Sequence, residues 1–588
     1  MLFRSLLNYE DAIPRGALAP GKRLVALGLV ARWLTATPDG DVTGAGFPSF
    51  LAASLPLREL TDRRGECIYA ACPHYRRCFI ESGQRRARRA QLVVANHALV
   101  MAHAARAAPD SGDDGEDPAE GPSRYVFDEG HHLFDAADSA FSAQLSGMEM
   151  AELRRWIKGP EGRSSRSRGL EERARELVEQ DSAGLAALEE ALAAASALGG
   201  DGWLARIRAG ASKNAGEIFL AHAYAHVLAQ CGETNGPYDL EAETRPLPEA
   251  LKEAAQALER ALGRLHKAML GLTAALHARL QREAAELDSK TRIRLEALAR
   301  GLERRTGTLL PAWRAMLADL EKEREDEPRF ADWFEIARDD GRDTDVGLKR
   351  HWIDPTLPFA ETVLKPAHGA LITSATLRDT GGEAGEDWRA AEVRTGAQHL
   401  PEPPARALFG SPFDWAKQAR IVVVRDLGRR DGDALAAAYR ELFLAAGGGA
   451  LGLFTSVRTL RTVHAKLVEP LAAAGLTLYA QHIDALDTGT LVDVFRSEEN
   501  ACLLGTDALR DGVDVPGRSL RLCVFDKIPW PRPTILHKAR RAHFGKSYDD
   551  LIVRLRLKQA FGRLIRSESD KGVFVLLDAA TPSRLLAA

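Results

Sequence analysis

Residues 501–525 read ACLLGTDALRDGVDVPGRSLRLCVF, in which a loop of small and acidic residues separates two apolar runs, Ala501–Leu504 and Leu520–Phe525. Similar short runs occur at Ile421–Val424, Ala450–Phe454, Leu476–Tyr479 and Val573–Leu577. Stretches with helical patterning, such as Gly432–Ala446 and Val457–Ala474, lie between the runs. Strands that alternate with helices are typical of a parallel sheet with both faces covered. The last third of the chain is therefore predicted to be an α/β domain.

The middle of the chain has a different character. From about Phe134 to Thr344 it is rich in Ala, Leu, Glu and Arg at helical spacing and has almost no strand-like runs, which predicts a helical insertion of domain size. Upstream, Leu92–Ala95 is a candidate buried strand, and His368–Thr373 is again strand-like. The acidic, glycine- and proline-rich segment Pro109–Ser123 is predicted to be a disordered loop.

The composition is that of an ordinary globular protein and sets limits on possible partners. The 588 residues are 45% hydrophobic and 27% charged, with a formal net charge of −3. Because the net charge is near zero, binding to nucleic acid requires local basic patches. No apolar run approaches the ~20 residues that span a bilayer, and the start of the chain does not resemble a secretion signal. We expect a cytoplasmic protein that does not bind membranes.

An acidic pair follows the short apolar run Tyr125–Phe127. In the segment Asp128–His131, called the acidic turn below, Asp128 could hold Mg²⁺ and Glu129 could activate water, as phosphoryl transfer requires. The same residues also suit an acidic turn that simply begins a helix. A metal site made by His131, His132 and Asp135 is a further alternative, although the spacing matches no zinc motif.

Two arginines stand near the carboxyl terminus in the segment Gln559–Arg566, called the arginine segment, which reads QAFGRLIR. Gln559, Arg563 and Arg566 are spaced i, i+4 and i+7, which predicts one face of a helix, with Gly562 allowing close approach. Such guanidinium groups could neutralise the charge that develops on a nucleotide triphosphate. The alternative is a solvated cationic helix, because Arg554, Arg556 and Lys558 come just before.

These strings, in this order, resemble the superfamily 2 helicases of the DinG/XPD type, specifically the bacterial DinG-like helicases. The acidic turn resembles their DEAH-type motif II, and Ser374–Thr376, called the coupling segment, resembles motif III. Further resemblances are Phe454–Ser456 to motif IV, Gly505–Gly517 to motif V, the arginine segment to motif VI, and Gly410–Asp414 and Lys527–Pro531 to flanking strings. Several short motifs in a fixed order are far more specific than one. Motif V departs from the family, because Arg510-Asp511 replaces the usual Trp-Glu pair.

The resemblance implies a role for each motif residue. Asp128 would hold Mg²⁺, Glu129 would be the general base, and His131 would act with Ser374 and Thr376 to couple hydrolysis to DNA. Arg563 and Arg566 would be arginine fingers, and Gln559 would sense the nucleotide. The remaining implied residues are Asp511 and Asp514 for coupling, and Gly512 and Gly562 for nucleotide binding.

Three of the six cysteines, Cys67, Cys72 and Cys78, lie close together. Thiolates bind iron–sulfur clusters, which normally need four cysteines. The spacing resembles the last three cluster ligands of DinG-like helicases, so we expect a [4Fe-4S] cluster with one cysteine missing from this sequence. Cys231, in the helical region, is a poor substitute. The alternatives are a zinc site with His74 as fourth ligand, or three unrelated thiols.

Six arginines surround these cysteines, namely Arg76, Arg77, Arg85, Arg86, Arg88 and Arg89. Clustered guanidinium groups suit phosphate contacts, so we expect them to bind DNA. The alternative is a solvated charge run without a ligand.

One element needed for ATP hydrolysis is not found. A phosphate-binding loop reads Gly-x4-Gly-Lys-Ser/Thr between a strand and a helix. Gly16-x4-Gly21-Lys22-Arg23 lacks the hydroxyl residue, and Gly545-Lys546-Ser547 lacks the first glycine, because Arg540 stands there. Both matches are accidental on this reasoning. In the family the loop precedes the cluster domain, so the sequence resembles a helicase that begins after its first motifs, cut short or degenerate. We expect it to bind ATP poorly and to hydrolyse it hardly at all.

The expected fold class is α/β, with two RecA-like parallel-sheet motor domains, the first of them incomplete. The predicted division is 1–90 for an iron–sulfur domain, 91–133 with 345–403 for the first motor domain, 134–344 for a helical insertion like the family's Arch domain, and 404–588 for the second motor domain. The implied function is an ATP-dependent DNA helicase that works as a monomer, moves 5′→3′ on single-stranded or forked DNA and serves DNA repair or replication. The alternatives are a non-catalytic iron–sulfur or zinc nucleic-acid-binding protein derived from a helicase, and a motor that acts on RNA.

Overall fold

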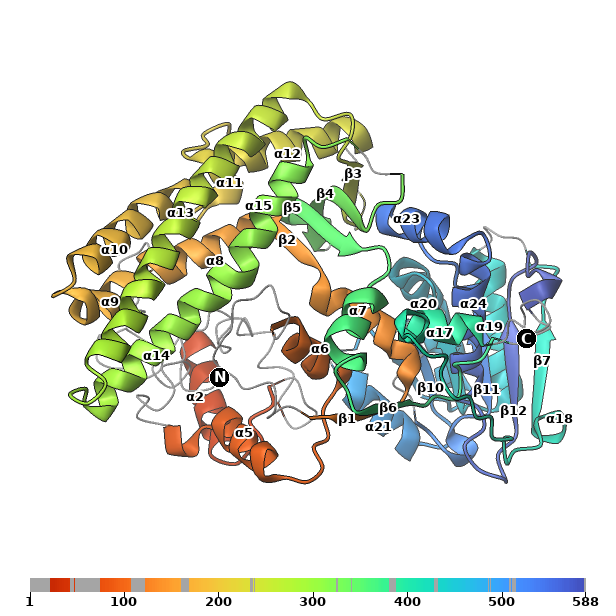
Figure 1. Ribbon diagram of the computed structural model, residues 1–588. Helices are drawn as coiled ribbons and strands as arrows, with labels where there is room; N and C mark the ends of the chain where they lie inside the picture. Colours follow the sequence, from red (N-terminus) through yellow and green to blue (C-terminus); the bar gives the residue numbers. More distant parts are fainter. Residues whose placement is uncertain are drawn as a thin grey trace.

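The computed structural model has a helical lobe and an α/β domain, with a smaller region containing two parallel strands between them (Figure 1). It describes residues 22–42, 47, 75–106, 122–159, 169–232, 236, 238–323, 326–339, 341–379, 388–427, 432–484, 486, 488–506, 509 and 514–585.

Six parallel strands form a sheet in the order β7-β12-β11-β8-β10-β9, within the range 404–588 that was predicted as the second motor domain and keeps that label below. They are β7 (Ala419–Val423), β8 (Ala450–Leu453), β9 (Leu478–Ala480), β10 (Cys502–Gly505), β11 (Leu522–Phe525) and β12 (Gly572–Leu576). Each overlaps a strand predicted from the sequence, so the predicted α/β class is confirmed for this domain.

Helices cover both faces of that sheet, as its apolar strands require. They are α19 (Gly432–Ala446), α20 (Val457–Ala473), α21 (Thr488–Ser497) and α24 (Tyr548–Phe561), with α18 (Trp415–Gln418) beside β7. The helix before α24, α23 (Ile535–Phe544), packs against the insertion. One buried cluster joins the sheet to α19 and α20, and a second joins it to α21 and α24.

The region predicted as the first motor domain, which keeps that label below, contains a much smaller sheet. Strands β1 (Arg124–Phe127) and β6 (Gly369–Ile372) pair in parallel, and their neighbours are α6 (His97–Arg106), α7 (Leu133–Phe141), α16 (Thr356–Phe359) and α17 (Arg389–Thr395). Phe127, Leu133 and Phe359 share one buried cluster. The predicted strand at Leu92–Ala95 is wrong, because these residues pair with no strand in the described part of the chain and Leu92 is 82% exposed.

The insertion is mainly helical, as predicted, although α7, which lies inside the predicted range 134–344, packs with Phe127 and Phe359 in the core beside the small sheet and is grouped with the first motor domain. Its helices are α8 (Gly147–Lys158), α9 (Leu170–Val178), α10 (Ser182–Ala194), α11 (Trp203–Arg208), α12 (Ala215–Cys231), α13 (Glu249–Arg282), α14 (Ser289–Arg304) and α15 (Leu310–Asp319). They bury a continuous core around Trp156, Leu272 and Trp313.

The near absence of strands that the sequence predicted for the insertion is wrong. An antiparallel sheet, ordered β2-β5-β4-β3, is formed by β2 (Ala143–Ser146), β3 (Leu240–Glu243), β4 (Phe330–Asp339) and β5 (Arg342–Trp352). Along β4 the side chains of Ala331, Trp333, Phe334 and Ile336 are all buried, with Asp332 and Glu335 between them. Because the neighbours Trp333 and Phe334 are both buried, the strand lacks the period of two that marks a half-buried strand, and its charges give it the composition of a helix.

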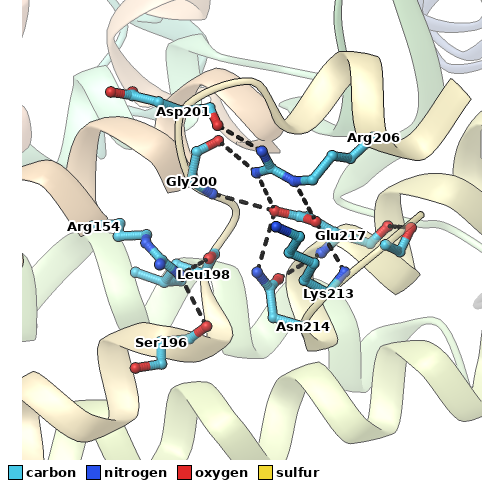
Figure 2. A network of polar contacts seen from close by, with 10 residues as sticks. Arg154, Ser196, Leu198, Gly200, Asp201, Arg206, Lys213, Asn214 and Glu217 are labelled. Carbon is cyan, nitrogen blue, oxygen red and sulfur yellow. Dashed lines mark hydrogen bonds and ion pairs between the residues drawn. The ribbon is translucent and has the colours of Figure 1, made fainter. Parts of the chain in front are cut away.

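A buried carboxylate holds one end of the insertion together (Figure 2). Glu217 is 1% exposed and accepts hydrogen bonds from the Arg206 guanidinium, the Lys213 backbone N–H and the Asn214 side chain. Burial alone would raise the pKa of Glu217, but these donors outweigh it and hold the pKa below its usual value. The cluster therefore fixes the connection between α10 and α12.

The amino-terminal part contributes α2 (Lys22–Leu34), a short helical turn η3 (Tyr75–Arg77) and α5 (Phe79–Arg89). Cys67, Cys72, His74 and residues 109–121 of the predicted loop lie outside the described residues. Where the structure is described, no helix is both long enough and apolar enough to cross a membrane.

Candidate active site

The acidic turn begins where β1 ends. Because β1 and β6 are parallel and Phe127 is opposite Ile372, the acidic turn and the coupling segment leave the sheet at the same edge. The Gly130 N–H donates to the Thr373 carbonyl over 2.9 Å, which ties the two connections together. A Cβ atom at Gly130 would lie 2.3 Å from Cγ2 of Ile372, so only glycine allows this approach.

Glu129 has an unusual backbone conformation. Its φ of 49° and ψ of 47° lie in the left-handed region, which non-glycine residues rarely adopt. The Glu129 side chain is 54% exposed, and its carboxylate accepts a hydrogen bond from Ser374 Oγ at 3.0 Å. Strained backbone persists only where surrounding contacts impose it, and it is concentrated at functional sites. Glu129 is thus fixed in place while its carboxylate remains accessible.

His131 connects the acidic turn to the coupling segment. Its side chain is 5% exposed, and its Nδ1 lies 2.7 Å from Ser374 Oγ and 3.2 Å from Glu129 Oε2. Ser374 Oγ in turn accepts a hydrogen bond from the Thr376 N–H at 3.3 Å. The fold therefore brings together four predicted residues, although His131 and Ser374 are 243 positions apart in sequence.

Asp128 lies beside this network at the same edge. Its Oδ1 accepts a hydrogen bond from the Glu129 N–H at 3.0 Å. In the described part of the chain, no group of three or more His, Cys, Asp or Glu side chains could hold a metal ion. The alternative site of His131, His132 and Asp135 is therefore not formed there. Mg²⁺ that arrives with phosphate oxygens needs only one or two carboxylates, and Asp128 can supply one.

The arginine segment is not one continuous helix, so the predicted shared face of Gln559, Arg563 and Arg566 is wrong. Helix α24 ends at Phe561, and Gly562 is its C-cap. Gln559 is 7% exposed on the last turn, whereas Arg563 and Arg566 follow the helix end. The turn is held by Asp570, whose carboxylate accepts the Arg566 N–H at 2.8 Å.

The solvated cationic helix, the alternative for this segment, is also contradicted. Arg554 is 6% exposed, and Val553, Leu557 and Ala560 are buried in the core of the domain. Helix α24 is therefore packed in the core of the domain. Arg563 and Arg566 lie in the loop that follows its last turn.

The loop after β10 lies at the carboxyl edge of the six-stranded sheet, as predicted. Asp511 and Gly512 are outside the described residues. Asp514 is described, and its carboxylate lies 3.4 Å from Arg566 Nε. The motif V and motif VI segments are thus in contact through one pair of predicted residues.

Two neighbouring residues were missed by the sequence reasoning. Gln481 is 7% exposed and its Oε1 accepts hydrogen bonds from the N–H and the hydroxyl of Thr506. His482 has a φ of 67°, and its Nε2 lies 3.2 Å from Thr506 Oγ1. A glutamine and a histidine in a loop carry no sequence signal of this kind, because only the fold places them beside β10.

The cysteine cluster cannot be assembled from the described residues. Cys78 is a half-buried free thiol at the start of α5 that makes no cap hydrogen bond, which leaves its sulfur available as a ligand. Its two expected partners lie outside the described ranges. The six arginines are all exposed on η3 and α5, and Arg85 also pairs with Glu81 and stacks on Tyr75.

The two motor domains touch next to the acidic turn. Arg394 donates to the His131 carbonyl at 3.2 Å, and its guanidinium lies 5.0 Å from the centre of the Phe134 ring. The Arg540 guanidinium, from the second motor domain, lies 4.9 Å from the same ring. The described contacts of Glu129 remain within the first motor domain, and the ion pair of Arg566 remains within the second.

Two parallel sheets, an acidic turn on one and an arginine segment beside the other, give the chain an α/β fold with RecA-like sheets. The helicase C-terminal domain family matches residues 439–584. An ATP-dependent helicase DinG from Mycobacterium tuberculosis is 38% identical over 192 residues, which are 30% of this chain and 28% of that protein. The ATP-dependent DNA helicase YoaA from Escherichia coli is 26% identical over 587 residues, 97% of this chain and 76% of that protein.

Among solved structures, S. tokodaii Xpd4 aligns with a TM-score of 0.37 and 13% identity, covering 77% of this chain and 71% of that chain. The sequence relatives show that this chain resembles the DinG/XPD-type helicases of superfamily 2. The chain spans only 28% of the length of the mycobacterial DinG that it matches.

Proposed function

We propose that this chain is an ATP-dependent DNA helicase of the DinG/XPD type that moves 5′→3′ on single-stranded DNA in DNA repair or replication. The network of Glu129, His131 and Ser374 is the observation that carries the proposal, since it joins a strained, exposed carboxylate to the coupling segment. The resemblance to relatives that are named ATP-dependent helicases supports it.

In this proposal Asp128 supplies a carboxylate to the Mg²⁺ that accompanies ATP, and Glu129 accepts a proton from the attacking water. His131 and Ser374 report the state of Glu129 to the DNA-binding surface through the hydrogen bonds described above. Arg563 and Arg566 neutralise charge on the transferred phosphoryl group, and Gln559 contacts the nucleotide. Asp511, Asp514, Gly512, Gly562 and Thr376 keep the supporting roles that the resemblance implies.

The exposed arginines of η3 and α5 are proposed to bind the phosphates of single-stranded or forked DNA. Such contacts give affinity that falls steeply with salt concentration. An iron–sulfur cluster bound by Cys67, Cys72 and Cys78 would anchor this segment and would supply rigidity and no hydrolytic chemistry. Iron and sulfide analysis of the purified protein distinguishes it from zinc.

The 588 residues contain no phosphate-binding loop, so we expect them by themselves to turn over ATP slowly. The test measures binding of fluorescent single-stranded DNA at low salt, together with DNA-stimulated ATPase activity at millimolar Mg²⁺-ATP. Glu129→Gln should abolish whatever turnover is found and leave DNA binding unchanged. Glu361→Gln, at another exposed acid of the first motor domain, is the matched control and should change neither.

The outcomes separate the candidate functions. DNA-stimulated turnover that depends on Glu129 supports the helicase, and a polarity assay on tailed duplexes then tests the direction. DNA binding without any turnover supports the second candidate, a non-catalytic nucleic-acid-binding protein. The missing phosphate loop and the exposed arginines are the observations behind this candidate. Equal competition by matched RNA indicates a motor that acts on RNA. Absence of DNA binding overturns both proposals.

A further inference from the structure

A buried ion pair crosses between the two motor domains. Arg554, on α24 of the second motor domain, donates from Nε to Asp379 Oδ1 over 2.8 Å and from Nη2 to Asp379 Oδ2 over 2.5 Å. The two residues are only 6% and 8% exposed. A two-point contact between a planar guanidinium and a carboxylate fixes orientation as well as distance.

The positions of the two partners connect them to the site. Asp379 follows the coupling segment by three residues, and Arg554 precedes Gln559 by five residues on the same helix. Close by, Lys558 Nζ lies 3.5 Å from the Arg378 carbonyl. The pair thus links the segment that contacts Glu129 to the helix whose end carries the arginine segment.

A second cross-domain contact lies on α23, the helix before α24. Arg540 is 8% exposed, and its Nη2 lies 2.7 Å from Asp138 Oδ1 on α7, the helix that follows the acidic turn. It also donates to the carbonyls of Trp352 at 3.0 Å and Ile353 at 3.2 Å. Helices α23 and α24 are therefore attached at two separate places, through Asp138 on the helix after the acidic turn and through Asp379 after the coupling segment.

A charge that is buried without its partner is strongly unfavourable, so each pair favours the apposed arrangement of the two domains over a separated one. If only association were needed, an apolar contact would serve equally well. A bidentate pair, in contrast, fixes how α24, which is packed in the core of its own domain, is oriented against the coupling segment. That orientation determines where Gln559 and the loop with Arg563 lie relative to Glu129.

We propose that Arg554 and Asp379 are positioning residues that set the orientation of α24 against the coupling segment, and so place the arginine segment relative to Glu129. The proposal rests on the helicase function above and deepens it. Neither residue touches the nucleotide in this mechanism. Their effect is carried by the helix that joins them to Gln559.

The test compares three variants with the unmodified chain. Arg554→Leu breaks the pair, and the double variant Asp379→Leu with Arg554→Leu replaces it by an apolar contact, which often preserves stability. Arg584→Leu is the matched control, because it breaks an ion pair with Asp550 on the same helix but inside one domain. Hydrogen exchange read by mass spectrometry reports residues 374–379 and α24 separately.

We expect Arg554→Leu to raise exchange about tenfold or more in both segments, with no change in β8 and β10 and no change for Arg584→Leu. The double variant should recover the melting temperature without recovering the turnover number, while the Michaelis constant for ATP and the affinity for single-stranded DNA stay within about twofold. Recovery of full turnover by the apolar pair, or exchange equal to that of Arg584→Leu, overturns the proposal. The exchange measurement needs neither ATP nor DNA, so it decides the positioning role even if the unmodified chain proves to have no helicase activity.

Discussion

The two parallel sheets of this molecule differ in how they are supported. In the six-stranded sheet of the second motor domain, Leu503 and Cys523 are completely buried between helices on both faces. In the two-stranded sheet of the first, Val126 is 71% exposed and Leu371 is 59% exposed. A two-stranded sheet has little independent stability. The acidic turn therefore follows a strand of the less stable sheet. The position of the acidic turn depends on contacts from neighbouring regions more than the position of the arginine segment does.

Besides the apolar cluster of Phe127, Leu133 and Phe359, three arginines make polar contacts with this region. Arg394, from the same domain, donates to the His131 carbonyl, whereas Arg540 and Arg554, from the second motor domain, pair with Asp138 and Asp379. The second sheet needs no such support, because its own apolar core is sufficient. The difference indicates that the first motor domain should respond to cross-domain substitutions, whereas the second should respond to substitutions in its core.

The largest expected effect is in the six-stranded core. Leu503→Ala removes a fully buried side chain from β10 and should lower the free energy of unfolding by about 2–5 kcal/mol. Val126→Ala, in the exposed face of β1, should change it by about 0.5 kcal/mol or less. The free energy of unfolding of each variant is measured by urea unfolding with hydrogen exchange as the readout. A similar cost for the two variants would show that β1 is covered in solution and would break the comparison.

The next effect tests the dependence of the small sheet on the second motor domain. Arg540→Ala leaves Asp138 with less compensation in a site where its side chain is 16% exposed. Loss of a buried ion-pair partner costs about 3–5 kcal/mol, and we expect the lower end of that range here, because His351 still contacts Asp138.

The neighbouring Arg541 provides the control, because its side chain is 53% exposed and its pair with Asp549 is a surface one. Arg541→Ala should cost about 0–1 kcal/mol. Segment-resolved exchange should place the effect of Arg540→Ala in α7 and β1. An effect confined to β8 and β10 would contradict the proposed dependence.

A pH dependence should distinguish the second motor domain. Burial raises the pKa of Asp526, at the end of β11, to about 6, although the Thr455 N–H and hydroxyl bind its carboxylate. The folded state then holds a proton that the unfolded state has released, so this group's contribution to stability falls as pH rises from about 4 to about 6.

A difference of about two pKa units corresponds to about 3 kcal/mol. Asp526→Asn should remove this slope, as measured by urea unfolding at a series of pH values. Glu441→Gln, at an exposed carboxylate of the same domain, should leave the slope in place. If stability still falls with pH in Asp526→Asn, the pH dependence belongs to another group.

The smallest expected effect concerns a helix cap in the well-supported domain. Ser456 begins α20, and its hydroxyl accepts the Thr459 N–H at 3.4 Å. Ser456→Ala should cost about 1 kcal/mol, the usual value for such a cap. Denaturation of the purified variant gives the number. A much larger loss of stability would mean that the second motor domain, like the first, depends on contacts outside its apolar core.

Much of the second motor domain could be predicted from sequence, because short apolar runs between helical stretches report a buried parallel sheet directly. The order of the motifs likewise pointed to the acidic turn, the coupling segment and the arginine segment. The prediction of strands failed where the composition of a segment does not reflect its burial. Strand β4 is buried on both faces and carries charges between its apolar residues, a composition that resembles a helix. Leu92–Ala95 is apolar but has no strand to pair with among the described residues.

The sequence by itself determined which residues are the candidates for the chemistry and that they follow two separate groups of strands, since strand patterning and motif order are local properties of the chain. Only the tertiary structure decided that Glu129 has a left-handed backbone conformation and accepts a hydrogen bond from Ser374. It also decided that α24 ends at Phe561 and that Arg554 is buried in an ion pair with Asp379. The physical reason is that side-chain pairing across domains depends on the positions of segments far apart in sequence. A charged residue has the same letter whether it faces water or a buried partner.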